Sequence, residues 1–241
     1  AEHVCILAQE AVPVPEGLAS DKAVCLCVNY LTAYAAMHDG VEVHEGESVL
    51  IHGVAGGVGS ALAHLGRIAG LEMIGTASAK NQELVASLGV TPIDYRNEDF
   101  VARVRELTGE GVDVVFDPVG GYGQVRRSHQ ALKPGGRLLW FGMAATKTQG
   151  MRAIPASMLA IGQLSVFRGG KSIALMEDLD KLAARDDWYQ RVQTEIFDHA
   201  ASGEIEPLVA ARFPLEEASS AHAFLEQGGH AGKVVLVTGA V

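Results

Sequence analysis

Residues 48–59 read Ser-Val-Leu-Ile-His-Gly-Val-Ala-Gly-Gly-Val-Gly, and this stretch decides the fold. Its first five residues form an apolar run of strand length. The glycine-rich segment that follows leads into apolar residues at helical spacing, Val58, Ala61, Leu62 and Leu65. A strand that passes through a glycine turn into a helix is typical of the unit with which parallel sheets bind phosphate groups. The alternative interpretation is a tight turn that binds no ligand.

The alternation of apolar strands and helices continues along the chain. Strands are expected at residues 48–52, 72–77, 92–95, 112–116 and 137–141, with a sixth at Leu164–Phe167 and shorter ones within 1–15, at 208–213 and at 233–238. Helices are expected at residues 21–38, 58–68, 82–88, 98–108 (capped by Asn97), 122–132, 186–202 and 215–227. Apolar strands that alternate with helices indicate a parallel sheet covered on both faces. The predicted fold class is α/β, a doubly wound parallel sheet of the Rossmann type.

Composition excludes several classes of function. The 241-residue chain has a net charge of -10 and no cluster of Lys or Arg, so nucleic-acid binding is not predicted. No apolar run reaches the roughly 18 residues that a membrane-spanning helix needs. Three cysteines, Cys5, Cys25 and Cys27, are too few for a disulfide framework, and we expect a reducing compartment, the cytoplasm. Cys25 and Cys27 have C-x-C spacing, not the C-x-x-C of a structural zinc site, so they are interpreted as small buried residues and no metal site is predicted.

The end of the second expected strand indicates which dinucleotide the turn would bind. NAD sites usually carry an acidic residue there for the ribose 2′-hydroxyl, but residues 76–80 read Thr-Ala-Ser-Ala-Lys. A hydroxyl and a cation suit a 2′-phosphate instead. Tyr95 and Arg96, at the end of the next strand, would lie beside the same pocket. We therefore predict NADP(H); the alternative is that Lys80 and Arg96 are solvated surface charges.

Several motifs occur in the order found in one enzyme superfamily. They are the glycine turn at 52–59, Phe-Asp-Pro-Val-Gly-Gly at 116–121, Leu-Lys-Pro-Gly-Gly-Arg at 132–137, Asn-Tyr-Leu-Thr-Ala-Tyr at 29–34, and the tail segments 214–222 and 232–236. On these motifs the chain resembles the medium-chain dehydrogenase/reductase superfamily. Within it, the chain is similar to the quinone oxidoreductase (zeta-crystallin-like) branch.

The resemblance implies a domain organisation. Members of the superfamily combine a GroES-like catalytic domain with a Rossmann domain, and the end of their chain returns to the catalytic domain. Residues 1–16 resemble a remnant of the catalytic domain, 17–206 the Rossmann domain, and 207–241 the returning segment. Because the resemblance begins at the last strand of the catalytic half and the sequence starts without methionine, we expect about 80–100 residues of that domain to be missing here.

The resemblance also implies roles for individual residues. Gly56, Gly57 and Val58 would hold the pyrophosphate, Ser78, Lys80, Tyr95 and Arg96 would surround the 2′-phosphate, and Asn29, Thr32, Phe141, Gly142 and Met143 would face the nicotinamide. The loop after Ser78 is one residue shorter than the family pattern, so Gln82 competes with Lys80 for the cationic position. Asn29 and Thr32 alternatively serve in helix packing. No catalytic residue is identified.

Together these inferences predict an NADPH-dependent oxidoreductase that transfers hydride to a quinone or an α,β-unsaturated carbonyl. Zinc is not expected to take part, because the position that matches a zinc-ligating cysteine of the family is Val28. The alternatives are an enoyl-reductase domain excised from a multidomain synthase and a non-catalytic NADPH-binding protein. The expected partners are a small electrophilic substrate and a second copy of the chain, paired through an edge strand at Leu164–Phe167. Neither nucleic acid nor a membrane is expected as a partner.

Overall fold

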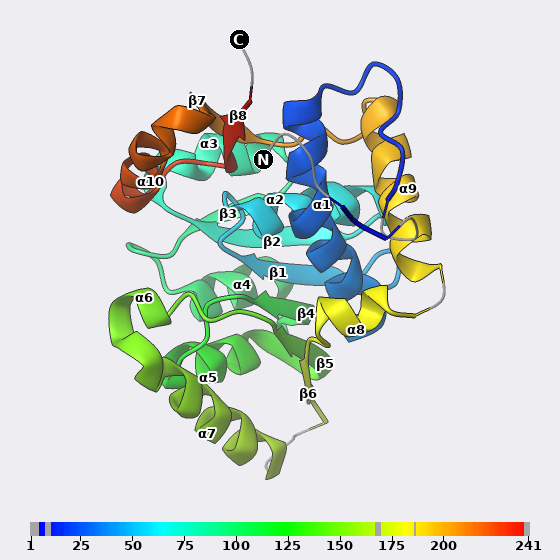
Figure 1. The fold of residues 1–241 in the computed structure, drawn as a ribbon. Helices are drawn as coiled ribbons and strands as arrows, with labels where there is room; N and C mark the ends of the chain where they lie inside the picture. The colour runs from blue at the N-terminus through cyan, green and yellow to red at the C-terminus, as the bar shows by residue number, and fades with distance from the viewer. Residues whose placement is uncertain (1–4, 8–10, 167–169, 186, 239–241) are drawn as a thin grey trace.

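The core of the fold is one parallel β-sheet (Figure 1), seen in a computed structural model that describes residues 5–7, 11–166, 170–185 and 187–238. Its strands are β1 (Ser48–His52), β2 (Glu72–Ala77), β3 (Thr91–Asp94), β4 (Val112–Asp117), β5 (Leu132–Trp140) and β6 (Ser172–Leu175). They lie in the order β3-β2-β1-β4-β5-β6, and every neighbouring pair is parallel. This is the strand order of a Rossmann sheet, so the predicted fold class is confirmed.

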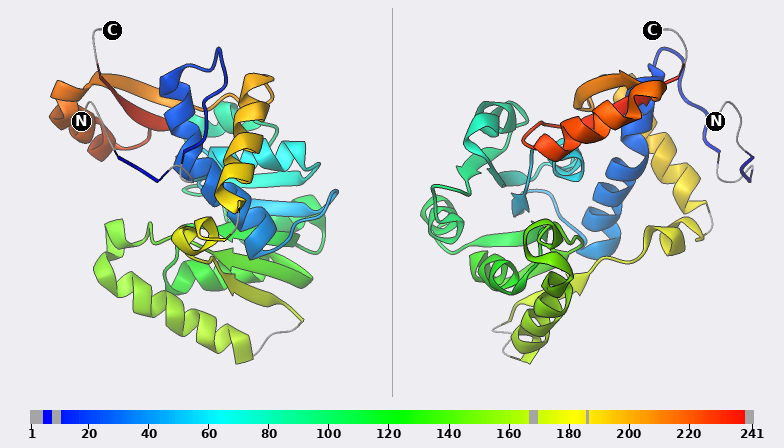
Figure 2. Two further views of the ribbon diagram at one scale, coloured as in Figure 1. Left: turned by 45° about the vertical axis from the view of Figure 1, so that its right-hand side comes forward. Right: turned by 60° about the vertical axis from the view of Figure 1, so that its left-hand side comes forward.

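Helices cover both faces of the sheet (Figure 1, Figure 2). They are α1 (Ser20–Ala35), η2 (Ala36–Gly40), α2 (Gly57–Ile68), η3 (Ala79–Asn81), α3 (Gln82–Ser87), α4 (Phe100–Thr108), α5 (Tyr122–Ala131), α6 (Thr146–Gln149), η4 (Gly150–Arg152), α7 (Ala153–Val166), α8 (Leu179–Ala183) and α9 (Trp188–Ala201). Of the helices in the described residues, none has the length and apolar character required to cross a bilayer.

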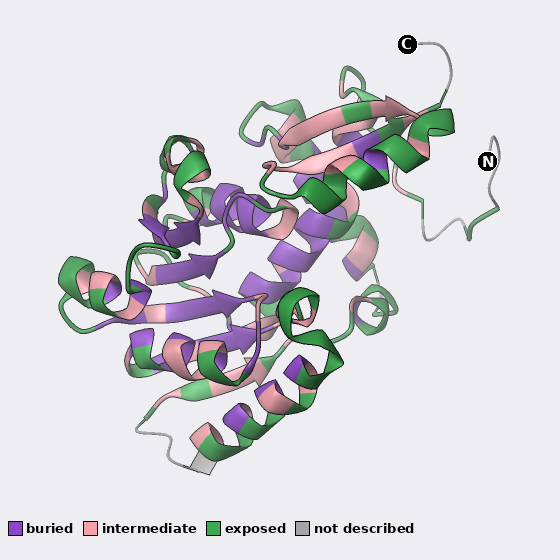
Figure 3. Cartoon of the chain, turned by 90° about the vertical axis from the view of Figure 1, so that its left-hand side faces the viewer, coloured by how far each residue is buried: buried purple, intermediate pink, exposed green. Residues whose placement is uncertain are grey.

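The two faces of the sheet bury separate apolar clusters. Val49 and Ile51 of β1 pack with side chains of α1, α2, α3 and α9, whereas Leu50 packs with side chains of α4, α5 and α7. Successive side chains of a strand point to opposite faces, so a strand with helices on both sides is apolar at every position. Figure 3 shows the result, with the central strands buried along their length.

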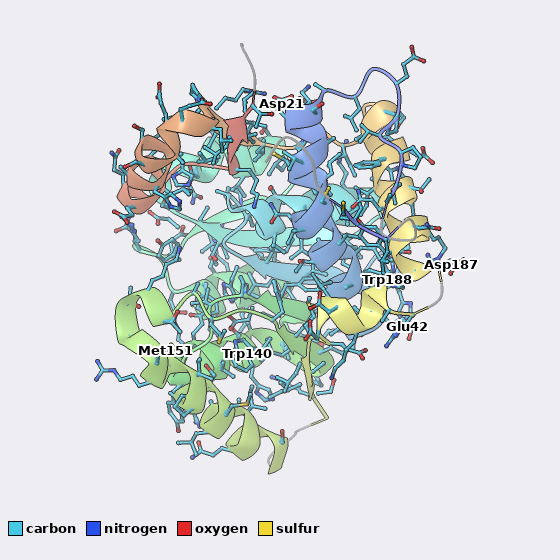
Figure 4. All side chains as sticks on the ribbon, in the orientation of Figure 1. Asp21, Glu42, Trp140, Met151, Asp187 and Trp188 are labelled. Carbon is cyan, nitrogen blue, oxygen red and sulfur yellow. The ribbon has the colours of Figure 1, made fainter. Side chains whose placement is uncertain are left out.

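A second, smaller sheet follows α9. It consists of β7 (Val209–Pro214) and β8 (Lys233–Val237), which pair in parallel, and of η5 (Leu215–Glu217) and α10 (Ala218–Gln227) between them. Arg212 of β7 donates to Asp21 at the start of α1, with an Nε–Oδ2 distance of 2.6 Å (Figure 4). The Gly232 N–H donates to the Ala55 carbonyl at 2.9 Å, which brings the end of the chain against the glycine turn. The two predicted strands around a helix are confirmed, and the domain boundaries stay predictions.

The prediction of a strand at Leu164–Phe167 was wrong. Residues 164–166 end the helix α7, Phe167 lies outside the described residues, and the sixth strand is β6. Within α7, the buried residues Ala153, Ser157 and Ala160 recur at helical spacing. They are small, and α7 packs beside α5. Small residues carry no strong apolar period, so this buried face was not predicted.

Two smaller predictions also need correction. The cap of α4 is Asp99, whose carboxylate accepts hydrogen bonds from the N–H groups of Val101 and Ala102 at 2.9 and 3.1 Å. Asn97 instead donates to the Asp94 carboxylate at 2.6 Å. Of the strand expected within residues 1–15, the described residues 5–7 and 11–15 have no strand, and the others lie outside the described part.

Candidate functional site

The glycine turn leaves the start of α2 open to an anion. Gly53 has a φ of 71°, which favours glycine, and its N–H donates to the Thr76 carbonyl at 3.0 Å. Gly56 caps α2 without any side-chain hydrogen bond. The first N–H groups of a helix, here those of Gly57 and Val58, have no acceptor within the helix itself. With the helix dipole, they favour a negatively charged group such as a phosphate.

Two glycines of this turn have no room for a side chain. A Cβ atom on Gly59 would lie 2.3 Å from the Gly53 carbonyl oxygen and 2.7 Å from the Cα of Val54. A Cβ atom on Gly57 would lie 2.3 Å from Nδ2 of Asn29. The predicted residue Asn29 of α1 therefore packs directly against the turn, and the turn offers bare backbone to a ligand. A backbone without side chains is the kind of surface that a phosphate group can approach closely.

Three of the residues predicted for the 2′-phosphate lie together. β2 and β3 pair Ala77 with Asp94, and the Tyr95 N–H donates to the Ala77 carbonyl at 3.4 Å. Ser78 and Tyr95 therefore follow neighbouring strands at the same level. The Arg96 guanidinium lies 5.7 Å from the centroid of the Tyr95 ring, and both side chains are exposed. A hydroxyl, a phenol and a cation thus share one exposed corner of the sheet.

The structure separates the two alternatives for the remaining cationic position. The Gln82 amide donates to the carbonyls of Ala77 and Ser78, at 3.1 and 3.4 Å, so it is held by its own strand end. Lys80 is exposed, and its Nζ would lie 2.0 Å from a Cβ atom built on Gly229. The Lys80 ammonium therefore lies between η3 and the loop before β8. Gln82 is uncharged and brings no cation to this space.

The residues predicted for the nicotinamide follow β5 and lie in α1. The Phe141 N–H donates to the Asp117 carbonyl at 3.2 Å, and a Cβ atom on Gly142 would lie 2.4 Å from the Pro118 carbonyl oxygen. Met143 is 51% exposed. The Thr32 hydroxyl donates to the Val28 carbonyl at 2.7 Å, within its own helix, which supports the helix-packing interpretation for this residue.

The strand order places these groups in a line along one edge of the sheet. β2 and β3 end at the predicted 2′-phosphate residues, β1 ends at the glycine turn, and β5 ends at Phe141. The chain changes direction between β1 and β4, which is where open parallel sheets bind their ligands. A dinucleotide bound with its pyrophosphate at the turn would have its adenosine half over β2 and its nicotinamide half over β4 and β5.

An apolar cleft lies at the nicotinamide end of this line. Its volume is about 430 Å³, and it is lined by Trp140, Phe141, Gly142, Met143, Met158, Leu175, Met176, Glu177, Asp178 and Leu179. The Trp140 indole N–H is buried and has no hydrogen-bond partner within the described part of the chain (Figure 4). Trp140, Met158 and Met176 were not predicted as site residues, because β5, α7 and the segment after β6 bring them together.

A buried polar cluster beneath the glycine turn was also missed. It consists of His52, Thr76, Asp117 and Ser128, whose side chains are joined by hydrogen bonds. The first three stand at or next to the ends of β1, β2 and β4, and each follows a run of apolar residues. A polar residue at the end of each of three buried strands is a signal that the sequence does contain.

The described residues do not form a zinc site. The Cys25 thiol donates to the Asp21 carbonyl at 3.2 Å and the Cys27 thiol to the Ala23 carbonyl at 3.5 Å. Burial raises the pKa of both thiols, which favours the protonated form over the thiolate that a metal requires. Within the described residues, no group of three or more His, Cys, Asp or Glu side chains is arranged to hold a metal ion.

Known proteins resemble the chain over nearly its whole length. The chain is 31% identical over 245 residues to the synaptic vesicle membrane protein VAT-1 homolog of Danio rerio, which covers 98% of this chain and 50% of that protein. It is 33% identical over 241 residues to a phenolphthiocerol/phthiocerol polyketide synthase of Mycobacterium tuberculosis, which covers 97% of this chain and 10% of that protein. The chain therefore spans half or less of the length of these two relatives.

Solved structures share the fold. A quinone oxidoreductase of Pseudomonas syringae superposes with a TM-score of 0.81 at 28% identity, covering 94% of this chain and 67% of that chain. The mycobacterial protein Rv1454c, complexed with NADPH, superposes with a TM-score of 0.79 at 29% identity, covering 93% and 67%.

The profile of one protein family settles the classification. The family described as zinc-binding dehydrogenase matches residues 88–236, which is more than half of the chain. The resemblance inferred from the motifs is thereby confirmed. The protein belongs to the zinc-binding dehydrogenase family of the medium-chain dehydrogenase/reductase superfamily, a superfamily of oxidoreductases.

Proposed function

We propose that this chain is the nucleotide-binding part of an NADPH-dependent oxidoreductase that reduces a quinone or an α,β-unsaturated carbonyl. The observation that carries the proposal is the open start of α2 at the glycine turn, where Gly56 provides no side-chain cap and Gly59 allows no Cβ atom. Backbone N–H groups at a helix start are suited to hold a pyrophosphate. The similarity to a structure that contains NADPH supports this assignment.

The preference for NADPH over NADH rests on the ends of β2 and β3. Residues 77–80 contain no carboxylate to accept a hydrogen bond from a ribose 2′-hydroxyl. The nearest acid, Asp94, is buried and is engaged by the Arg96 N–H and the Asn97 amide, at 3.1 and 2.6 Å. Ser78 and Arg96 at this corner, and Lys80 in the space between η3 and the loop before β8, can donate hydrogen bonds to a phosphate.

The apolar cleft beside Phe141 is the proposed site of the acceptor. When bound, the nicotinamide supplies a hydride to an electron-poor carbon. The chain's own residues orient the acceptor and exclude water, since Met143, Met158 and Met176 line the cleft with flexible apolar surface. Val28 stands at the position that matches a zinc-ligating cysteine of the superfamily, and without zinc to polarise a carbonyl an acceptor already activated by conjugation fits best. Quinones and α,β-unsaturated carbonyls meet this condition.

Two alternatives follow from particular observations. The match to 10% of a polyketide synthase favours an enoyl-reductase domain within a synthase as the second candidate. Such a domain would act on a 2-enoyl thioester instead of a quinone. The third candidate is a protein that binds NADPH without turnover.

The test is a fluorescence titration of this chain with NADPH and NADH, followed by oxidation assays. We expect NADPH to bind about tenfold or more tightly than NADH, since a 2′-phosphate adds charge-assisted hydrogen bonds. NADPH oxidation is then measured with phenanthrenequinone and with a 2-enoyl thioester, on this chain and on a version extended to the length of its relatives. Consumption only with the thioester selects the synthase domain, binding without consumption selects the non-catalytic protein, and absence of binding refutes the proposal.

The role of Arg96 can be tested separately from that of Lys80. Arg96→Ala is expected to raise the Kd for NADPH roughly tenfold and to leave the Kd for NADH unchanged, because one charge-assisted hydrogen bond to the 2′-phosphate is lost. Lys80→Ala is the matched variant for the other cation, and Arg103→Ala, on the outer face of α4, is the control. Equal loss of NADPH and NADH affinity in Arg96→Ala would show that Arg96 does not recognise the 2′-phosphate.

Assembly and location complete the proposal. We expect a homodimer formed through β6, which is one of the two edge strands of the sheet and takes the place of the edge strand predicted at Leu164–Phe167. Light scattering of the purified chain gives its mass in solution, and a monomeric mass would contradict the dimer.

The cytoplasm is the proposed compartment, and relatives named for synaptic vesicle membranes make membrane association the alternative.

A further inference from the structure

A continuous chain of buried side chains runs beneath the sheet edge that carries the glycine turn. His52 ends β1 and is 2% exposed. Its Nδ1 lies 3.1 Å from the Thr76 hydroxyl, and its Nε2 lies 3.2 Å from the Ser128 hydroxyl. The Ser128 hydroxyl donates to Oδ2 of Asp117 at 2.7 Å, and Asp117 is fully buried. Four residues from four elements thus form one hydrogen-bonded path.

Both ends of the path reach backbone turns at the proposed cofactor site. At one end, the Gly53 N–H, which opens the glycine turn, donates to the Thr76 hydroxyl at 3.2 Å. At the other end, Oδ1 of Asp117 accepts from the N–H groups of Val119 and Gly120 at 2.8 and 3.0 Å. The turn at residues 118–121 is the one against which Gly142 packs. The path therefore connects the pyrophosphate turn with the segment proposed to face the nicotinamide.

With a neutral imidazole, and with the Ser128 hydroxyl donating to Asp117, the hydrogens on this path can be assigned in one way. Ser128 has a single hydroxyl hydrogen, and Asp117 receives it. The contact between Ser128 and His52 must then use a hydrogen on Nε2 of the imidazole. A neutral imidazole with a hydrogen on Nε2 has a lone pair on Nδ1, which accepts the Thr76 hydroxyl hydrogen. That leaves the Thr76 oxygen as the acceptor for the Gly53 N–H.

We propose that His52, neutral and with its hydrogen on Nε2, is a positioning residue that fixes the glycine turn and the 118–121 turn relative to each other. In this role His52 touches neither the cofactor nor the acceptor; it acts through Thr76, Ser128 and Asp117. The contribution to NADPH binding rests on the proposed function, whereas the coupling of the two turns does not.

The surroundings of the imidazole favour this state. The imidazole and the Phe100 ring pack in a T-shaped arrangement at a centroid distance of 4.8 Å, and the Arg127 guanidinium lies 4.4 Å from the centroid of the Phe100 ring. Burial is the main cause that lowers the pKa of His52, and Arg127 acts in the same direction. Asp117 raises it, through the intervening Ser128 hydroxyl. A neutral imidazole therefore persists at pH 7.

The experiment compares two substitutions of similar volume. His52→Gln keeps an N–H donor for Ser128, and His52→Met has none. Amide hydrogen exchange is measured at Gly53, Val119 and Gly120, together with the Kd for NADPH. We expect His52→Met to accelerate exchange at both turns and to raise the Kd about tenfold, the equivalent of one lost hydrogen bond, while His52→Gln stays within about threefold of the wild type.

A control and a second pair of variants exclude a general loss of stability. Val192 of α9 is fully buried, and Val192→Ala creates a cavity beside that helix. This variant is expected to change neither the Kd for NADPH nor the exchange rates at the two turns relative to each other. If His52→Met does not fold, Thr76→Val and Thr76→Ser supply the same comparison, since only the latter keeps the hydroxyl. Nitrogen chemical shifts of the imidazole report its tautomer directly.

The outcomes separate this inference from the proposed function. Equal exchange at Gly120 in His52→Met and His52→Gln would overturn the inference, as would an imidazole with its hydrogen on Nδ1 or doubly protonated at pH 7. If the wild type binds no NADPH, the proposed function fails, and the exchange measurements still decide whether His52 couples the turns. The inference is supported if amide exchange is faster at both Gly53 and Gly120 in His52→Met and at neither of them in His52→Gln.

Discussion

Replacing Gly59 with alanine is expected to weaken NADPH binding on the order of 100-fold and to lower the free energy of unfolding by about 1–3 kcal/mol. The added Cβ would meet the Gly53 carbonyl oxygen at 2.3 Å and the Val54 Cα at 2.7 Å. Both are backbone atoms, so no flexible side chain can move aside. The turn must therefore shift away from α2, and the N–H groups that would hold the pyrophosphate shift with it.

Gly123→Ala is the matched control for this change. Gly123 also stands near the start of a helix, α5, but a Cβ atom there would meet no other atom within 4 Å. Alanine is the better helix former, so this variant is expected to gain about 0.5–1 kcal/mol of stability and to bind NADPH like the wild type. Chemical denaturation and fluorescence titration measure both quantities. A Gly59→Ala protein that binds NADPH normally would show that the close contact of turn and helix is not needed.

The second large expected effect is a loss of folding stability at acidic pH. The free energy of unfolding is expected to fall by about 3 kcal/mol between pH 7 and pH 4 because of His64 alone. His64 lies in α2, and burial together with the nearby Arg67 lowers its pKa from 6.5 to about 4. Its ring is hydrogen-bonded to the Tyr30 hydroxyl, with 2.7 Å between Nδ1 and the hydroxyl oxygen. Between pH 6.5 and pH 4, His64 is protonated in the unfolded chain but stays neutral in the folded chain, so stability is lost as the pH falls.

Urea denaturation at several pH values tests this expectation. His64→Gln retains hydrogen-bonding groups but does not titrate. Between pH 6.5 and pH 4, the slope of its unfolding free energy against pH should therefore be smaller than that of the wild type, by the equivalent of up to one bound proton. Other histidines whose pKa is lowered by burial, His38, His52 and His129, contribute equally to both proteins and cancel in the comparison. Parallel pH curves for the two proteins would contradict the assignment to His64.

The fold was largely predictable because its strands are buried on both faces. Runs such as Val49–Ile51 contain only apolar residues, which a doubly covered sheet selects, and a glycine turn after Ser48–His52 marks the crossover. Residues 153–166 were not predictable in this way. The buried face of α7 consists of Ala153, Ser157 and Ala160, and small residues carry no strong apolar period.

The glycine turn was predictable because it lies in one continuous segment, and the grouping of Ser78 with Tyr95 and Arg96 was predictable because they follow two neighbouring strands. The glycine turn is a local motif, and its close packing follows from the glycines themselves. The path through His52 joins residues that are 24, 76 and 11 positions apart in its successive steps. The polar residues at the strand ends mark candidate members, but no local pattern shows that they are joined. The position of Lys80 beside Gly229 likewise depends on how the small sheet docks, which local spacing does not specify.

The hydrogen bond from Gly232 to Ala55 makes the small sheet a neighbour of the phosphate cradle and not a detachable appendage. Removing the residues after α9 would leave the Ala55 carbonyl of the glycine turn without its donor, the Gly232 N–H. It would also expose the side of η3 where Lys80 lies beside Gly229. Anyone grafting this Rossmann core onto another scaffold must therefore carry residues 207–237 with it, even though the six-stranded sheet is already complete without them.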